Sequence, residues 1–286
     1  MSLSCFAQSY AQARQAFLNS CARRGLAVES HIHPLPGRDG EQLAIDVALH
    51  GQADAPNLLV ISSGCHGVEG FCGSAIQVDR LNDDAWFATS TRDDLAVLYI
   101  HALNPYGFSH LRRVTHENVD LNRNFLDFSQ ALPDNAEYRR LAPVLLPRKW
   151  PAGPLNLLKL LIFALRYGRK GLQAGISRGQ HSDPKGLFFA GTAPTWSNQQ
   201  LRQILRQHGQ GCQNLAWVDL HTGLGPRGHG ERIYKGRQNA DDIARCRRWW
   251  GAEVTNAAEG NSASANLNGT IDLAVLEECP QAQYTG

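Results

Sequence analysis

The sequence lacks a marked excess of charge of either sign. Its 28 lysine and arginine residues nearly balance its 26 aspartate and glutamate residues, so the formal net charge at pH 7 is +2. Proteins that bind nucleic acid or anionic membranes usually carry a stronger basic excess, because opposite charges attract them to their partners. The composition therefore gives no argument for either partner, and we expect neither nucleic acid nor a membrane.

The sequence also lacks a paired cysteine framework. Its seven cysteines are an odd number and are scattered from position 5 to position 279. This pattern is typical of reduced thiols in a cytosolic protein and not of a disulfide scaffold. The first residues contain no apolar core of the kind that a secretory signal requires. We therefore expect a cytoplasmic location.

No hydrophobic run is long enough to cross a bilayer. The most apolar stretch, LNLLKLLIFALRYG at 155–168, contains Lys159 and is shorter than the roughly 20 residues that a spanning helix needs. We predict a helix that is buried or lines a groove; whether it is a lid, a subunit contact or plain core stays open. Contact with anionic lipid is a less favoured alternative, suggested by the basic cluster of Lys149, Arg166, Arg169 and Lys170.

Apolar runs alternate with helical patterns along the chain. Strands are predicted at 43–49, 58–63, 95–102 and 215–220, and helices at 70–81 and at 197–207, the latter capped by Ser197. An earlier helix would turn inward Phe6, Tyr10, Ala13 and Phe17. Such alternation predicts an α/β fold in a single domain, 1–286, with a mostly parallel mixed sheet and helices on both faces.

Side chains that can bind a metal follow two of the predicted strands. His66 and Glu69 come after the strand that ends at Ser63, and His221 directly follows the strand at 215–220. In such sheets, functional groups gather just past the carboxyl ends of the strands. Two imidazoles and one carboxylate, with an open fourth position, are the ligand set of a catalytic zinc. The sequence therefore predicts a hydrolase site with one zinc ion.

A polar loop after the strand at 95–102 adds charged groups to this edge. It contains Arg113, Asp120, Asn122 and Arg123. The planar guanidinium of Arg123 is suited to bind a carboxylate through two hydrogen bonds, and Asn122 adds directional bonds. The loop therefore indicates a substrate that carries a carboxylate.

Two other kinds of chemistry receive less support. Cys65 and Cys72 flank the His66/Glu69 pair, but their spacing is not that of a zinc knuckle, so packing is the favoured interpretation. No G-x-S-x-G motif is present, which argues against a serine hydrolase.

The motifs HGVEG, NPYGF, DLNRNF and DLHTG, in this order, resemble the zinc carboxypeptidase superfamily, which includes succinylglutamate desuccinylase and aspartoacylase. The longer strings SSGCHGVEGFCGSAIQ and VDLHTGLGP look most similar to an uncharacterised bacterial branch of metallopeptidases. The resemblance extends from about residue 40 to the end of the chain. It implies a bacterial protein with a zinc carboxypeptidase-like fold.

The resemblance implies a role for each motif residue. His66, Glu69 and His221 would hold one zinc ion, and Asp120 would orient a zinc-bound histidine by accepting its other ring proton.

Asn122 and Arg123 match the pair that grips the substrate carboxylate. Arg113 would polarise the scissile carbonyl and stabilise the oxyanion, with Arg112 as the alternative.

The resemblance also implies a general-base glutamate on a strand well downstream of His221. The sequence ends at 282–286, where that strand should begin, so we expect a chain truncated before this residue. The alternatives are that another carboxylate serves, or that the domain binds zinc without efficient turnover. The carboxylates weighed are Glu231, Glu277 and Glu278.

The sequence as a whole predicts a zinc-dependent hydrolase that cleaves an amide bond near a carboxylate. The expected substrate is a peptide, as for a carboxypeptidase, or an N-acyl amino acid, as for the aspartoacylase branch. A zinc-binding domain without efficient catalysis is the alternative from another class.

Overall fold

The computed structural model describes residues 3–147 and 149–286, with the backbone alone at 169, 170 and 174. Its centre is a six-stranded sheet in the order β1-β2-β4-β3-β5-β6. The strands are β1 (Val28–Ile32), β2 (Ala44–His50), β3 (Asn57–Ser63), β4 (Leu95–His101), β5 (Asn214–Leu220) and β6 (Gln283–Thr285). β1 and β2 pair antiparallel, as do β2 and β4, whereas β4, β3, β5 and β6 run parallel. The predicted mixed, mostly parallel sheet is confirmed.

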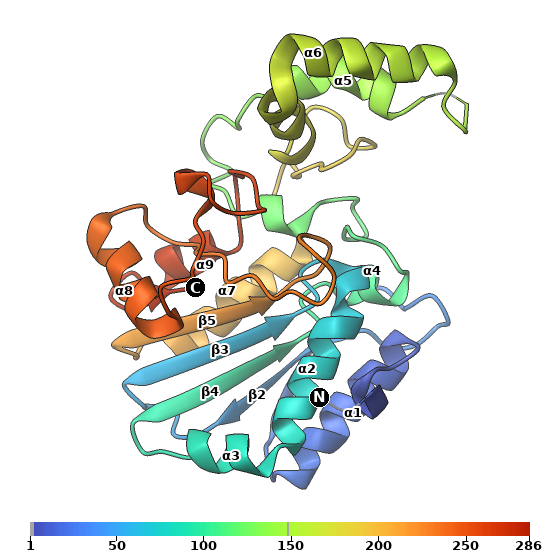
Figure 1. Cartoon of the computed structure of the whole chain (residues 1–286). Helices are drawn as coiled ribbons and strands as arrows, with labels where there is room; N and C mark the ends of the chain where they lie inside the picture. Colours follow the sequence, from blue (N-terminus) through green and yellow to red (C-terminus); the bar gives the residue numbers. More distant parts are fainter. Residues whose placement is uncertain (1–2, 148) are drawn as a thin grey trace.

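Helices cover both faces of the sheet (Figure 1). One face packs against α1 (Tyr10–Arg23) and α2 (Gly70–Asn82), and the other against α7 (Trp196–Gly209) and α9 (Asp272–Glu278). Successive β4 side chains point to opposite faces: Val97 packs with the α1–α2 layer, and Leu98 with the α7–α9 layer. A strand buried on both faces reads as a continuous apolar run, which is why the sequence revealed it.

The N-terminal helix follows its predicted pattern. Tyr10, Ala13 and Phe17 are buried, and burial of each large side chain stabilises the fold by about 1.5–3 kcal/mol. The Tyr10 hydroxyl donates to the carbonyl of Ala44 and accepts from its N–H, which ties the helix to β2. The Ser9 hydroxyl caps the helix by accepting from the N–H of Gln12.

The predicted cap of the helix at 197–207 is wrong. α7 begins earlier, at Trp196, and its cap is Thr195, whose hydroxyl accepts from the N–H of Asn198. Ser197 is buried inside the first turn. Thr and Ser have similar capping ability, so the local sequence does not distinguish between them.

Shorter elements connect these layers. They are α3 (Asp84–Ser90), α4 (Pro105–Ser109), α8 (Ala240–Trp250) and the 3-10 turns η1 (Leu3–Cys5), η2 (Gly67–Glu69), η3 (Leu121–Arg123) and η4 (Ala257–Glu259).

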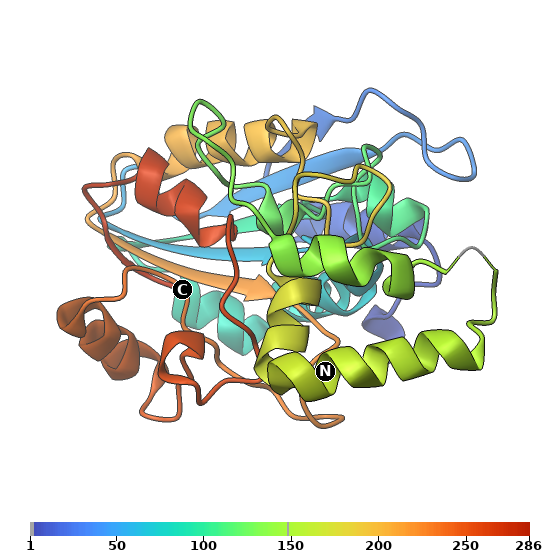
Figure 2. The ribbon, with the colours of Figure 1, turned by 90° about the horizontal axis from the view of Figure 1, so that it is seen from above.

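A helical hairpin stands apart from the sheet and its covering helices (Figure 1). It consists of α5 (Ala136–Leu145) and α6 (Pro154–Ser177), which lie side by side when seen from above as well (Figure 2). The stretch 155–168 is helical, as predicted, but the expectation that it is buried is wrong, because most of its leucines are exposed. No helix among the described residues combines the length and the apolar character needed to traverse a bilayer.

Candidate metal centre

Two neighbouring strands deliver the candidate metal ligands. β3 and β5 pair in parallel, with Ser63 opposite Leu220, so the chain leaves both strands at the same edge of the sheet. His66 and Glu69 follow β3, and His221 is the first residue after β5. One donor atom from each of these three side chains lies within 4.8 Å of the other two. The structure therefore brings the predicted trio together.

The turn that carries His66 and Glu69 is fixed by its backbone. The N–H groups of Gly67 and Val68 donate to the carbonyls of Arg113 and Arg112 at 3.3 and 3.0 Å. A Cβ at Gly67 would lie 2.0 Å from the carbonyl carbon of Gly107. Only glycine permits this close approach, which places the predicted polar loop beside the ligands.

Asp219 orients the ring of His221. Its Oδ2 accepts a hydrogen bond from Nε2 of His221 at 2.5 Å, and its Oδ1 accepts from the Ser62 hydroxyl at 2.5 Å. The Ser62 hydroxyl oxygen accepts in turn from the indole N–H of Trp217 at 2.8 Å. These groups lie on β3 and β5, so the rigid sheet sets the direction of the imidazole. Sequence reasoning missed Asp219, although two residues apart along a strand point to the same face.

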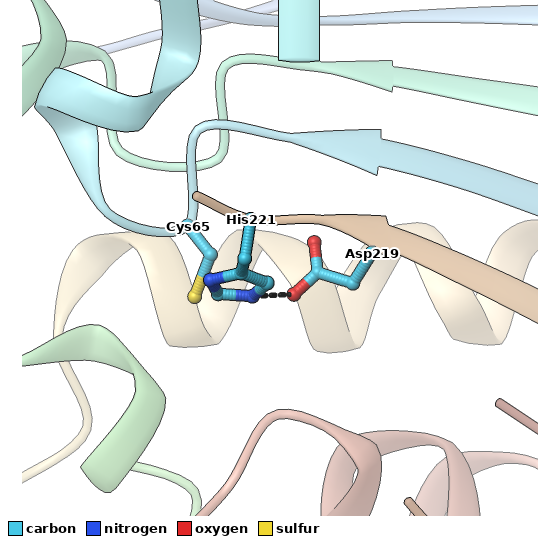
Figure 3. Close-up of side chains that lie close together, drawn as sticks. All are labelled: Cys65, Asp219 and His221. Atoms are coloured by element: carbon cyan, nitrogen blue, oxygen red, sulfur yellow. Dashed lines mark hydrogen bonds and ion pairs between the residues drawn. The ribbon is translucent and has the colours of Figure 1, made fainter. Parts of the chain in front are cut away.

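Cys65 lies on the other side of the same imidazole (Figure 3). Its thiol, the Asp219 carboxylate and the His221 ring form a second group whose donor atoms all lie within 4.8 Å of one another. Burial lowers the pKa of His221, but Asp219, Cys65 and Glu69 outweigh it and raise the pKa well above 6.5. Burial raises the pKa of the Cys65 thiol to about 12. A thiol this hard to ionise fits the packing role favoured from the sequence.

The imidazole of His66 is buried. Burial lowers its pKa to about 3, and the charge of Arg113 adds to this effect while Asp120 opposes it. Its Nε2 accepts from Nη2 of Arg113 at 2.8 Å. Its Nδ1 lies 3.6 Å from Oδ1 of Asp120 and has no hydrogen-bond partner among the described residues.

Glu69 is an ionised carboxylate next to both imidazoles. Burial raises its pKa, but a hydrogen bond with His221, the charge of His66 and the Thr222 N–H hold it below the ordinary value. The Thr222 N–H donates to Oε2 at 2.6 Å, and Nδ1 of His221 lies 3.5 Å from the same oxygen. Two imidazoles and one carboxylate are donor types that bind zinc. Nδ1 of His66 is also buried without a hydrogen-bond partner among the described residues, which fits a ligand atom.

Asp120 anchors the polar loop. It is fully buried and accepts from Nε of Arg113 at 3.0 Å and from the backbone N–H of Asn122 at 3.1 Å. Burial raises its pKa, but the charges of His66, Arg123 and Arg113 outweigh this and lower it to about 2. Asp120 lies 3.6 Å from Nδ1 of His66, and its hydrogen bonds go to Arg113 and Asn122.

Arg123 is a buried cation held by carbonyl groups. It is 3% exposed, and its Nε and Nη1 donate to the carbonyls of Ser177 and Asn122, each at 2.7 Å. Burial lowers its pKa, the carboxylate of Asp120 opposes this, and the nearby charge of Arg113 adds to it. The side-chain oxygen of Asn122 accepts from the N–H of Ile271 at 3.0 Å, so it also fastens the segment that precedes α9. The Asp120 carboxylate offsets part of the positive charge of Arg123, but the hydrogen bonds described for the guanidinium go to carbonyl groups, so an anionic ligand could still pair with it.

The structure separates the two candidate arginines. Nη1 of Arg113 lies 3.6 Å from Glu69, whereas Nη2 of Arg112 donates to Oδ1 of Asn118 at 3.0 Å. Arg113 therefore faces the candidate metal centre, and Arg112 contacts the loop beside it.

The carboxylates weighed as general bases bind elsewhere. Glu231 accepts from the Thr255 hydroxyl and the N–H of Ala263. Glu277 and Glu278 form ion pairs with Arg202, at 2.6 and 2.9 Å. Neither set belongs to a group of described residues able to hold a metal.

Asp272 and Lys235 are buried ionisable groups that influence each other electrostatically, which the sequence did not suggest. Burial raises the pKa of Asp272, and the charge of Lys235 acts against this. Burial lowers the pKa of Lys235, and the charge of Asp272 acts against this. Oδ1 of Asp272 is buried without a hydrogen-bond partner among the described residues. Asp272 also interacts with the charge of Asp219, and Lys235 with that of Arg123. The pair therefore belongs to the electrostatic surroundings of the candidate metal centre.

Comparison with solved structures confirms the carboxypeptidase fold. Carboxypeptidase A from Helicoverpa armigera matches with a TM-score of 0.51 and 13% identity, over 96% of this chain and 63% of that one. Bovine thrombin-activatable fibrinolysis inhibitor, in its complex with tick carboxypeptidase inhibitor, matches with a TM-score of 0.52 and 11% identity, over 96% of this chain and 84% of that one. At such identities the similarity establishes the fold alone. This chain spans about two thirds of the length of the Helicoverpa armigera enzyme.

Sequence comparisons place the chain in a family without a described activity. No curated protein matches it. A family described as "Protein of unknown function (DUF2817)" matches residues 6–286, which is nearly the whole sequence, and the chain therefore belongs to that family.

Proposed function

We propose that this chain is a zinc-dependent hydrolase that cleaves an amide bond near a substrate carboxylate. His66, Glu69 and His221 would hold one zinc ion. The observation that carries the proposal is the convergence of these three donors at the ends of adjacent strands, within 4.8 Å of one another. A bound zinc ion would polarise the scissile carbonyl and supply an activated water.

Asp219 and Asp120 would act as positioning residues for this centre. A carboxylate that accepts the far ring proton of a metal-bound histidine fixes its tautomer and orientation. The 2.5 Å bond between Asp219 and His221 supports this role most directly. Asp120, at 3.6 Å from His66, would act in the same way on the other imidazole.

Arg113 would be released from His66 when a cation binds. If Nε2 of His66 were the ligand atom, it could no longer accept the hydrogen bond from Nη2 of Arg113. If Nδ1 were the ligand atom, Nε2 would carry the ring proton and could likewise no longer accept from arginine. In both cases Nη2 of Arg113 becomes available to a substrate carbonyl while Nε stays bonded to Asp120. Such a donor stabilises negative charge that develops on the carbonyl oxygen.

Arg123, with Asn122, would anchor the substrate carboxylate. The buried guanidinium is already ordered by its two carbonyl partners, so binding an anion costs little side-chain entropy. A peptide with a free C-terminus is the preferred substrate, and an N-acyl amino acid is the alternative within the same chemistry.

The experiment compares metal content and hydrolysis in one preparation. We expect about one zinc per chain in the wild type and loss of zinc in His221→Ala. His229→Ala, which alters an exposed histidine, is the matched control and should keep the metal. Blocked dipeptides with free or amidated C-termini, and N-acyl amino acids, would then identify the substrate class. Less than stoichiometric zinc that is equal in both variants would contradict the proposal.

A zinc-binding domain without efficient catalysis is the second candidate. It is supported by the engagement of Glu231, Glu277 and Glu278 in other contacts. Stoichiometric zinc together with no hydrolysis of any of these substrates would favour it.

A further inference from the structure

The first half of α6 presents a continuous apolar face to solvent. Its side chains are 52% to 77% exposed and follow the helical spacing that aligns residues on one side. They are Leu155, Leu157, Leu158, Leu161, Ile162 and Leu165. Single exposed leucines are common on protein surfaces, but a contiguous patch of this kind marks an interaction site.

The opposite face of α6 packs within the hairpin. Leu160, Phe163 and Tyr167 are half-buried, and Tyr138 and Leu141 of α5 are buried. The two helices of the hairpin thus pack through these residues, and the exposed leucines do not take part in this packing. We call these six exposed residues of α6 the leucine face.

The hairpin is strongly basic. Between Glu137 and Asp183 the sequence contains no acidic residue and nine basic ones. They are Arg139, Arg140, Arg148, Lys149, Lys159, Arg166, Arg169, Lys170 and Arg178. The even charge balance of the whole chain therefore conceals a strongly cationic hairpin on a net acidic body.

Basic side chains border the leucine face. Lys159 and Arg166 are exposed. Each lies four residues, about one helical turn, after a residue of the leucine face, Leu155 and Ile162 respectively, and so at the edge of that face. Residue 148 and the side chains of Arg169 and Lys170 lie outside the described residues. Trp150, in the loop between the two helices, is 85% exposed. Tryptophan and flanking cations beside an apolar stripe are the features of helices that lie in a bilayer interface.

We propose that the α5–α6 hairpin docks on the surface of an anionic lipid bilayer. The leucine face enters the boundary between headgroups and acyl chains, and the cations bind the lipid phosphates. The straight part of α6 before Gly168, where the backbone turns to φ 68°, is about 21 Å long at 1.5 Å per residue. This is less than the roughly 30 Å hydrocarbon core, so the helix lies in the plane of the surface.

Charge favours a bilayer over a second copy of this chain. Two hairpins that meet through their leucine faces would bring like charges together, with Glu137 as the single acidic residue of each hairpin sequence. An anionic bilayer satisfies the cations and the leucines at once.

Docking would also hold the candidate metal centre near the membrane. The carbonyl of Ser177, at the end of α6, accepts from Nε of Arg123 at 2.7 Å. The base of the hairpin is therefore part of the wall around the buried arginine.

The test is flotation of the full chain with vesicles of phosphatidylcholine that contain no or about 30 mol% phosphatidylglycerol. We expect at least about tenfold stronger binding to the anionic vesicles, weakened by salt. Leu158→Glu with Leu165→Glu should reduce binding at least about tenfold. The matched control is Leu3→Glu with Ile32→Glu, which adds the same charge at exposed apolar sites outside the hairpin and should bind almost normally.

A second measurement follows the hairpin directly. Brominated phospholipid should quench tryptophan fluorescence in the wild type and quench it less in Trp150→Phe. Binding that is equal for both lipid compositions, or equal in both glutamate pairs, would overturn the proposal. So would a soluble dimer that Leu158→Glu with Leu165→Glu dissociates in the absence of vesicle binding.

Discussion

Nε2 of His221 donates a 2.5 Å hydrogen bond to Asp219, which stands two residues earlier, near the end of β5. Because Asp219 lies in β5 and His221 directly follows this strand, the sheet holds the carboxylate in place beside the imidazole. The remaining nitrogen of His221 then faces Glu69 at 3.5 Å. This relationship makes Asp219 the first residue to test after the ligands themselves.

Asp219→Asn should weaken zinc binding about 10- to 100-fold without unfolding the protein, because the amide no longer holds the imidazole as its carboxylate does. The measurement is competition with a chelator of known affinity, with thermal unfolding of the metal-free protein alongside. Asp127→Asn, at an exposed carboxylate that accepts hydrogen bonds from Ser129, is the control. Unchanged affinity in Asp219→Asn would remove this residue from the centre.

Arg113→Gln and Arg112→Gln form a matched pair for the proposed hydrolysis. Arg113 contacts His66 and Glu69, whereas Arg112 contacts Asn118. Loss of a donor to the developing oxyanion should lower kcat by about 10²- to 10³-fold in Arg113→Gln, with little change in Arg112→Gln. Steady-state kinetics on a blocked dipeptide would measure both. A larger loss in Arg112→Gln would reverse the assignment.

Arg123→Lys tests the carboxylate anchor. Lysine keeps the charge but cannot reproduce the fork that the carbonyls of Ser177 and Asn122 hold in place. We expect KM to rise at least about tenfold for substrates with a free carboxylate and to change little for amidated ones. An equal rise for both classes would indicate a general structural defect and contradict the anchoring role.

The apolar runs of the sequence predicted the sheet, because burial of a strand determines where its apolar residues stand. The central strands are covered on both faces, so their sequences are continuous apolar runs. The group of His66, Glu69 and His221 could also be predicted from the sequence. His66 and His221 follow two such runs, and parallel neighbouring strands end at the same edge of the sheet.

Two features could not be obtained in this way. The leucines of α6 have the composition of core residues, and composition alone does not say whether another element covers them. Asp219 lies within an apolar run, and His221 was interpreted only as a metal ligand, so the hydrogen bond between them was not predicted. Which side chain a carboxylate bonds depends on the register of β3 and β5, which the sequence does not specify.

The buried His101 predicts a loss of stability in mild acid. Its ring stacks on Phe17, its Nε2 bonds the Ser74 hydroxyl at 2.9 Å, and burial lowers its pKa to about 4. The unfolded chain binds a proton near pH 6.5, and the folded protein does so only near pH 4, so stability falls as pH decreases between these values. From about pH 7.5 to about pH 5 this residue alone should remove about 2 kcal/mol. Urea unfolding at both pH values should show a smaller decrease in His101→Gln than in the wild type, while His229→Gln, at an exposed site, should keep the full decrease. An identical pH dependence in all three proteins would mean that His101 is protonated in the folded state.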